Sequence, residues 1–96
     1  MGLAAIIEAN AAQIRALATR HSAANPRLFG SVLREADHET SDIDILVDAL
    51  PGATLFDLGG LQMDLQDLLG APVDLLTPRD IVPAIRDKVL AEARPI

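Results

Sequence analysis

Two short motifs and one later aspartate carry the residue types that phosphoryl chemistry needs. Gly30-Ser31 closes a short apolar segment, and Asp42-x-Asp44 opens the next one after ten intervening residues. A third carboxylate, Asp74, lies near the start of another apolar segment. Because side chains alternate along a strand, Asp42 and Asp44 are expected to project from the same face of a sheet. Two carboxylates so placed suit a hard divalent cation.

The connections between these segments predict how the strands run. If Ser31 is to lie near Asp42, the first two strands must be antiparallel. A crossover of about twenty residues that contains a helix favours a third strand parallel to the second. Asp74 would then lie beside Asp44, and three carboxylates would gather at one edge of the sheet.

This arrangement suits phosphoryl or nucleotidyl transfer. The Ser31 hydroxyl and the N–H groups after Gly30 can hold phosphate oxygens, helped by the positive end of a short helix predicted over residues 31–36. Clustered carboxylates need cations to stay ionised, and oxygen ligands favour Mg²⁺. Two such ions about 3.5–4 Å apart would stabilise both oxygens of an in-line displacement. Asp74 would bind the ion that activates the nucleophile, and Arg34 would take charge from the leaving pyrophosphate.

The elements that must position these residues follow from periodicity and capping signals. The predicted order is αβαβαβα, an α/β (α+β) fold with a small three-stranded mixed sheet flanked by helices. Gly59-Gly60 costs a helix about 1 kcal/mol per glycine, which predicts an irregular first turn. Thr54 and Asp57 resemble a capping box, and Gly70 a helix end. The remaining predicted bounds are a helix over 3–20, strands over 27–30, 43–49 and 73–77, and a last helix that Pro83 opens.

Composition limits the classes of function. The 96 residues predict one domain spanning residues 1–96. A net charge of -6 with only eight Lys and Arg argues against nucleic-acid binding, and no Tyr or Trp offers a stacking platform. The absence of cysteine excludes disulfides and thiolate metal sites and fits a reducing cytoplasm, where we expect the protein to act. No apolar run approaches a membrane span, which predicts no membrane partner.

At these motifs the sequence resembles the nucleotidyltransferase superfamily of DNA polymerase beta. That superfamily has Gly-Ser, a spacer of similar length, Asp-x-Asp and a third carboxylate on a later strand. Residues 29–34 and 41–47 look like the minimal nucleotidyltransferases, and the likeness extends through residues 73–76. Two positions depart from the pattern, because Leu33 and Glu35 stand where many members carry Ala and Gly.

The resemblance implies a polymerase beta-like nucleotidyltransferase fold and an antitoxin that transfers AMP from ATP to a tyrosine hydroxyl of a helical HEPN ribonuclease toxin. It implies Asp42, Asp44 and Asp74 as catalytic residues that hold two Mg²⁺ ions. Gly30 and Ser31 would hold the triphosphate, with Arg34 assisting. Two other functions stay open: an antitoxin that neutralises its partner by binding alone, and a nucleotidyltransferase that modifies a small molecule of the aminoglycoside type.

Each of these residues also has a purely structural interpretation. Ser31 could be a plain helix cap, and Asp42 could belong to a turn. Asp44 and Asp74 are harder to explain structurally, because Asp is disfavoured inside a strand of Ile, Leu and Val. The remaining polar residues are expected to be solvated; they include His21, His38, Glu35, Asp37, Glu39, Asp48 and Arg86.

Overall fold

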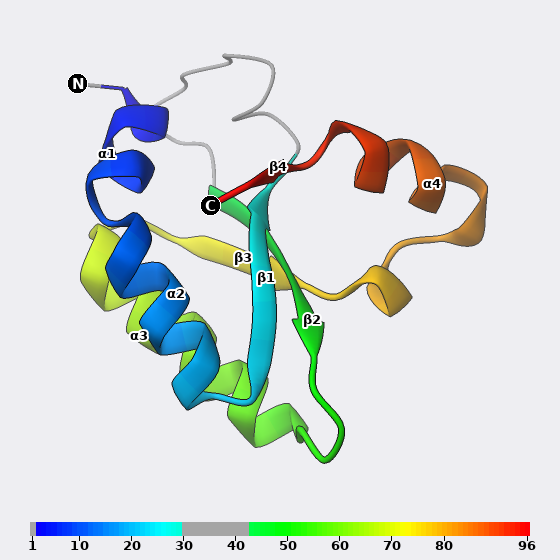
Figure 1. The fold of residues 1–96 in the computed structure, drawn as a ribbon, viewed down its shortest axis with the longest axis horizontal. Helices are drawn as coiled ribbons and strands as arrows, with labels where there is room; N and C mark the ends of the chain where they lie inside the picture. Colours follow the sequence, from blue (N-terminus) through cyan, green and yellow to red (C-terminus); the bar gives the residue numbers. More distant parts are fainter. Residues whose placement is uncertain (1, 30–42) are drawn as a thin grey trace.

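A computed structural model describes residues 2–29 and 43–96 of the chain (Figure 1). Two helices lead into the first strand, and one further helix connects the second strand to the third. The elements are α1 (Leu3–Ala9), α2 (Ala11–Arg20), β1 (Ala23–Leu28), β2 (Ile43–Ala49), α3 (Leu55–Leu69), β3 (Val73–Leu76), the 3-10 turn η2 (Pro78–Asp80), α4 (Pro83–Glu92) and β4 (Arg94–Pro95).

The sheet has the strand order β3-β2-β1-β4. β1 runs antiparallel to β2, and β2 runs parallel to β3, so both predicted strand directions are confirmed. The predicted count of three strands is one too few, because β4 pairs with β1 through Arg27 and Leu28. A two-residue strand that contains a proline has no periodicity to reveal it in the sequence.

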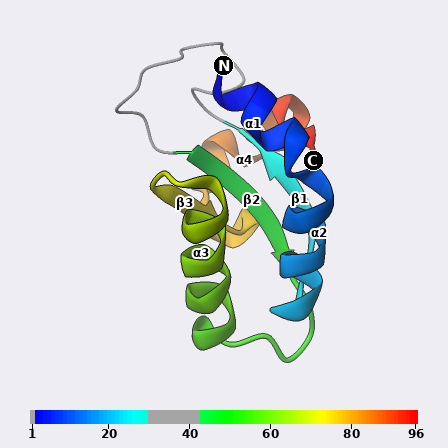
Figure 2. The same ribbon diagram turned by 90° about the vertical axis from the view of Figure 1, so that its left-hand side faces the viewer.

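The two faces of the sheet differ in what covers them. Ile43, Ile45 and Val47 of β2 point to the face that we call the helix face, and they are fully buried in one core cluster with residues of α2 and α3. Asp44, Leu46 and Asp48 alternate with them and point to the opposite face, which we call the carboxylate face. Figure 2 shows α2 and α3 on one side of the sheet and α4 on the other. Each fully buried aliphatic side chain contributes about 1.5–3 kcal/mol to stability.

The helix predicted over residues 3–20 is two helices, with a break at Asn10. The Asn10 side chain donates a hydrogen bond to the carbonyl oxygen of Ile6 at 2.8 Å, and its backbone leaves the helical region. A short amide side chain that bonds to the preceding turn competes with helix continuation.

The first strand begins earlier than residue 27, the predicted start. It opens at Ala23 and contains an irregularity between Ala24 and Arg27. Asn25 lies there at a φ of 55°, a region that asparagine tolerates better than most residues, and it is followed by Pro26. Pro26 therefore lies inside a strand, at an irregularity in the pairing where proline, which has no N–H, is tolerated.

α3 confirms its predicted start and end. Thr54 and Asp57 form a reciprocal capping box, and Gly70 ends the helix in the left-handed conformation. The irregular first turn predicted from Gly59-Gly60 is wrong, because the helix is continuous from Leu55 to Leu69. The third strand ends at Leu76, one residue early, and α4 opens at Pro83 as predicted. Among the described residues, none of the helices has the length and apolar character to cross a membrane.

Candidate active site

Two of the predicted carboxylates are neighbours across β2 and β3. Asp44 and Asp74 are register partners on adjacent parallel strands. Strands in such a pair lie about 4.8 Å apart, so the two side chains project side by side. Asp44 is half-buried and Asp74 is exposed, so the pair lies on the carboxylate face within reach of solvent. The predicted juxtaposition of these two residues is therefore present.

Two hydrogen bonds fix the register that brings these carboxylates together. The Ile43 N–H donates to the carbonyl oxygen of Pro72 at 2.9 Å, and the Val73 N–H donates to Oε1 of Gln66 at 3.1 Å. Gln66 belongs to α3, which is itself packed on the helix face through Leu61, Leu65 and Leu69. The helix after β2 thus sets where β3 begins, and one residue of slip would turn Asp74 to the other face.

The rest of the predicted site lies outside the described residues. This applies to Gly30, Ser31, Arg34 and Asp42, to the short helix over residues 31–36, and to His38 and the acidic residues of the polar loop. The described chain leads directly to this segment from both sides, because β1 ends at Leu28 and β2 begins at Ile43. The roles of these residues stay predictions.

The donor chemistry of the described pair fits a hard cation. Asp44 and Asp74 supply carboxylate oxygens only, which is the ligand type that Mg²⁺ prefers. Two adjacent carboxylates also repel each other unless a positive charge lies close to both. Residues 2–29 and 43–96 contain no group of three or more His, Cys, Asp or Glu side chains that could hold a metal ion by themselves.

Comparison with known proteins decides the family. A family described as nucleotidyltransferase domain matches residues 12–96. The chain belongs to the nucleotidyltransferase domain family. A protein of Methanocaldococcus jannaschii that bears the provisional name protein adenylyltransferase MJ0435 is 43% identical over 77% of this chain and 80% of its own. The predicted resemblance and the predicted enzyme class are confirmed.

Solved structures agree with this nucleotidyltransferase assignment. One described as a minimal nucleotidyltransferase superposes with a TM-score of 0.88 at 40% identity, covering 100% of this chain and 97% of its own. Another, described as a toxin-antitoxin with AMP-PNP, has a TM-score of 0.72 at 26% identity and covers 90% of this chain and 71% of its own. These likenesses confirm the predicted fold class.

Asp48, another carboxylate of this nucleotidyltransferase, is 41% exposed, as its predicted solvation requires, but it also has partners that were not predicted. Its oxygens accept hydrogen bonds from Nδ2 of Asn25 at 2.9 Å and from the Arg27 guanidinium at 3.1 Å. The Asn25 bond, with the bond and charge of Arg27, holds the pKa of Asp48 below its usual value although partial burial raises it. Arg27 also donates to the carbonyl oxygen of Asn25, so it ties the β1 bulge to β2. No pattern in the sequence indicates this cluster, because β1 was expected to begin only at Arg27.

Two further residues predicted as solvated have partners. Nε2 of His21 lies 2.7 Å from Oδ2 of Asp64 on α3, and its side chain is only 19% exposed. Arg86 of α4 donates to the carbonyl oxygens of Pro78 and Ile81, which ties that helix to the turn before it. Each of these contacts joins two elements of the fold and neither includes Asp44 or Asp74.

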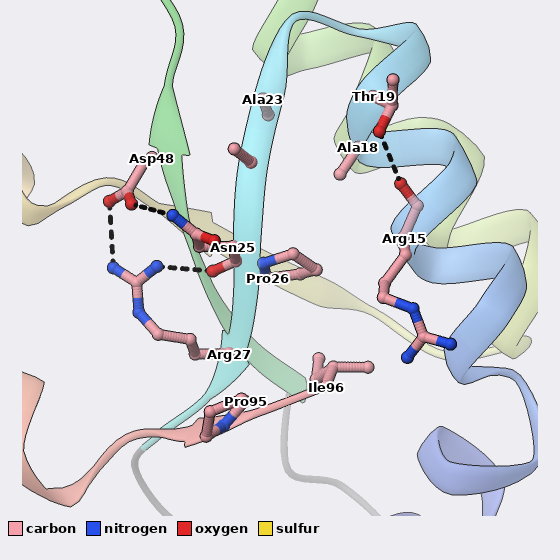
Figure 3. Close-up of a pocket in the computed structure, with 11 residues that line it drawn as sticks. Arg15, Ala18, Thr19, Ala23, Asn25, Pro26, Arg27, Asp48, Pro95 and Ile96 are labelled. Carbon is pink, nitrogen blue, oxygen red and sulfur yellow. Dashed lines mark hydrogen bonds and ion pairs between the residues drawn. The ribbon is translucent and has the colours of Figure 1, made fainter.

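A cavity of about 580 Å³ lies along the outer edge of β1 (Figure 3). Asn25, Arg27 and Asp48 line one side of it, and Arg15 and Ile96 line the other. It contains neither Asp44 nor Asp74. β4 pairs with β1 here, and the Ile96 N–H donates to the carbonyl oxygen of Pro26 at 2.9 Å.

Proposed function

We propose that this chain is a Mg²⁺-dependent protein adenylyltransferase that transfers AMP from ATP to a tyrosine hydroxyl of a cognate toxin and thereby acts as an antitoxin. The observation that carries the proposal is the pairing of Asp44 with Asp74 on parallel strands, in a chain of the nucleotidyltransferase family. Residues 1–96 would form a single catalytic domain, acting in the cytoplasm.

The proposed reaction is an in-line displacement at the α-phosphorus of ATP. The tyrosine oxygen forms a bond to that phosphorus while the bond to the bridging oxygen of pyrophosphate breaks. Asp74 lies at the solvent side of the pair and would help remove the proton of the hydroxyl. Gly30 and Ser31 would hold the triphosphate, and Arg34 would stabilise the negative charge on the leaving pyrophosphate.

Asp42, Asp44 and Asp74 would hold Mg²⁺. When bound, the cation neutralises the clustered carboxylates and stabilises the charge that develops on the attacking and leaving oxygens. The carboxylates of Asp44 and Asp74 are held beside each other because the register of β2 and β3 fixes both residues. A substitution that removes either carboxylate would weaken the binding of the cation.

The acceptor and the nucleotide donor are inferred from similar proteins. Similarity to a toxin-antitoxin structure that contains AMP-PNP, and to a provisionally named protein adenylyltransferase, supports a toxin as acceptor and ATP as donor. We propose a helical toxin of the HEPN type. The chain contains no tyrosine, so it cannot be its own acceptor on that residue type.

The test is a transfer assay with purified components. The chain is incubated with Mg²⁺, each of the four labelled nucleoside triphosphates in turn, and the protein encoded by the neighbouring gene. We expect label from ATP on a tyrosine of that protein, located by mass spectrometry, and none with Asp44→Asn or Asp74→Asn. Absence of label on any protein acceptor, with label on an aminoglycoside instead, would favour a small-molecule nucleotidyltransferase.

Neutralisation by binding alone is the other candidate. It is separated from catalysis by the variant in which Asp42 and Asp44 are both changed to Asn. If cells that produce this variant stay protected from the toxin while no adenylylated product forms, catalysis is not how the chain acts. If protection and product are lost together, binding alone is excluded.

A further inference from the structure

Two adjacent glycines in α3 differ in what the fold requires of them. A Cβ added at Gly60 would lie 3.0–3.2 Å from the His21 ring, so Gly60 allows that ring to approach the helix and contact Asp64. A Cβ added at Gly59 would meet nothing within 4 Å. Glycine destabilises a helix interior, and no contact in the described chain explains why Gly59 is not a larger residue.

Gly59 lies in a row of residues that points away from the core. Residues spaced three or four positions apart lie on the same face of a helix. On α3 this spacing joins Phe56, Gly59, Met63 and Asp67. The buried residues Leu61, Leu65 and Leu69 define the opposite face. We call the outward row the α3 stripe.

The α3 stripe exposes an unusual amount of apolar surface. Phe56 is 92% exposed and Met63 is 66% exposed, while the adjacent Leu55 is 86% exposed. Phe56 is one of only two phenylalanines in the chain. Large apolar side chains exposed on one side of a helix are typical of an interaction site. Between Phe56 and Met63, Gly59 leaves a gap in which another helix could approach the backbone closely.

Charge restricts what can cover this stripe. α3 carries three aspartates and no Lys or Arg, and its last turn has no basic residue. Asp67 therefore lies near the negative end of the helix dipole with no basic residue on α3 to offset it. A second copy of the chain is a poor occupant, because each copy has a net charge of -6 and two copies repel each other.

We propose that the α3 stripe is the docking surface for one helix of the toxin, with apolar side chains against Phe56 and Met63, its backbone over Gly59 and a Lys or Arg facing Asp67. The identity of the partner rests on the proposed function. The stripe belongs to a helix on the helix face, whereas Asp44 and Asp74 lie on the carboxylate face. Docking and chemistry are therefore carried by different surfaces and can be separated by substitution.

The experiment measures the affinity between the full-length chain and the protein encoded by the neighbouring gene, by calorimetry. Phe56→Asp and Met63→Asp together are expected to weaken binding at least about 30-fold, as for removal of a central interface anchor. Gly59→Leu is expected to weaken it about 10-fold while leaving the chain folded, because the space around Gly59 is open. Asp67→Lys should weaken binding most at low salt.

Val82→Asp is the matched control. Val82 is 60% exposed, close to the value for Met63, but it precedes α4 on the other side of the sheet. The affinity of the Val82→Asp variant for the protein encoded by the neighbouring gene is expected to stay within about threefold of wild type. Circular dichroism and thermal unfolding establish that each variant is folded. Gly59→Ala should raise the melting temperature more than Gly60→Ala does, because a Cβ at position 60 would crowd the His21 ring.

The outcomes separate this proposal from the proposed function. A complex that survives the Phe56 and Met63 substitutions, or is lost with Val82→Asp instead, overturns the docking surface. Failure of the wild-type pair to form any complex overturns it as well. A dimer of the chain alone that Phe56→Asp dissociates would identify a second copy as the occupant. A complex that needs the α3 stripe but yields no adenylylated product overturns only the proposed catalysis.

Discussion

Asp44 and Asp48 belong to the same strand and point to the same face, but the fold treats them differently. Asp48 receives hydrogen bonds from Asn25 and Arg27 of the neighbouring strand β1. Asp44 has another carboxylate, Asp74, as its register partner on β3. One end of the strand thus pairs a negative charge with a positive one, and the other end places two negative charges side by side.

The partners of Asp48 and Asp44 show how a carboxylate that stabilises the fold can be distinguished from one that belongs to a functional site. At Asp48 the protein supplies its own cation, and the arrangement joins β1 to β2 across the bulge. At the other end, two carboxylates lie side by side, an arrangement that a bound divalent cation would stabilise. A fold that keeps such a pair at fixed register is suited to binding a divalent ion and its substrate.

The largest expected effect is on catalysis. Asp44→Asn or Asp74→Asn should lower the rate of nucleotidyl transfer about 1000-fold, because each removes a carboxylate that would hold the cation. Asp48→Asn should leave that rate within about threefold of wild type, because its partners are structural. Single-turnover transfer of labelled AMP measures the rate for each of the three variants. Equal losses at Asp44 and Asp48 would contradict the division drawn between the two ends of β2.

The second effect is on stability and has the reverse pattern. Arg27→Ala should lower the free energy of unfolding by about 1.5 kcal/mol, because the Arg27 side chain is largely buried and a charge-assisted bond is lost. Asp74→Asn should change it by no more than about 0.5 kcal/mol, because the Asp74 side chain is exposed. Urea denaturation followed by circular dichroism gives both values. A strongly destabilised Asp74→Asn variant would mean that this carboxylate has a structural function.

The same residues show which contacts could be predicted from the sequence and which could not. The pairing of Asp44 with Asp74 followed from alternation along a strand and from the length of the helical crossover, both of which are local rules. The partners of Asp48 and of His21 could not be predicted, because each contact joins residues 21 or more positions apart. The break at Asn10 and the start of β1 were missed because side-chain competition and a bulge override periodicity.

The third effect is the response of stability to Mg²⁺. A ligand that binds only the folded state stabilises it by about 0.8 kcal/mol at three times its Kd, which corresponds to about 4 °C for a domain of this size. The wild type and Asp48→Asn should both show this rise in melting temperature. The double variant Asp44→Asn, Asp74→Asn should show none. Ca²⁺ at equal ionic strength distinguishes site binding from general screening of the acidic chain.

The smallest expected effect is the pH dependence that Asp48 confers. Its pKa is lowered in the folded state from an ordinary value of 3.8, chiefly by the bond from Asn25 and then by Arg27. The folded state therefore favours the ionised carboxylate, and the stabilisation is complete above the unfolded pKa and lost as pH falls through the folded one. Because the side chain is 41% exposed, solvent screening limits the contribution to about 0.5 kcal/mol.

The comparison of wild type with Asp48→Asn isolates this contribution from that of the other carboxylates. The difference in unfolding free energy between the two proteins should be constant from pH 7 down to about pH 4 and should shrink below it. Urea denaturation at a series of pH values measures that difference. If it instead grew below pH 4, Asp48 would favour protonation in the folded state, and Asn25 and Arg27 could not be the groups that hold it ionised.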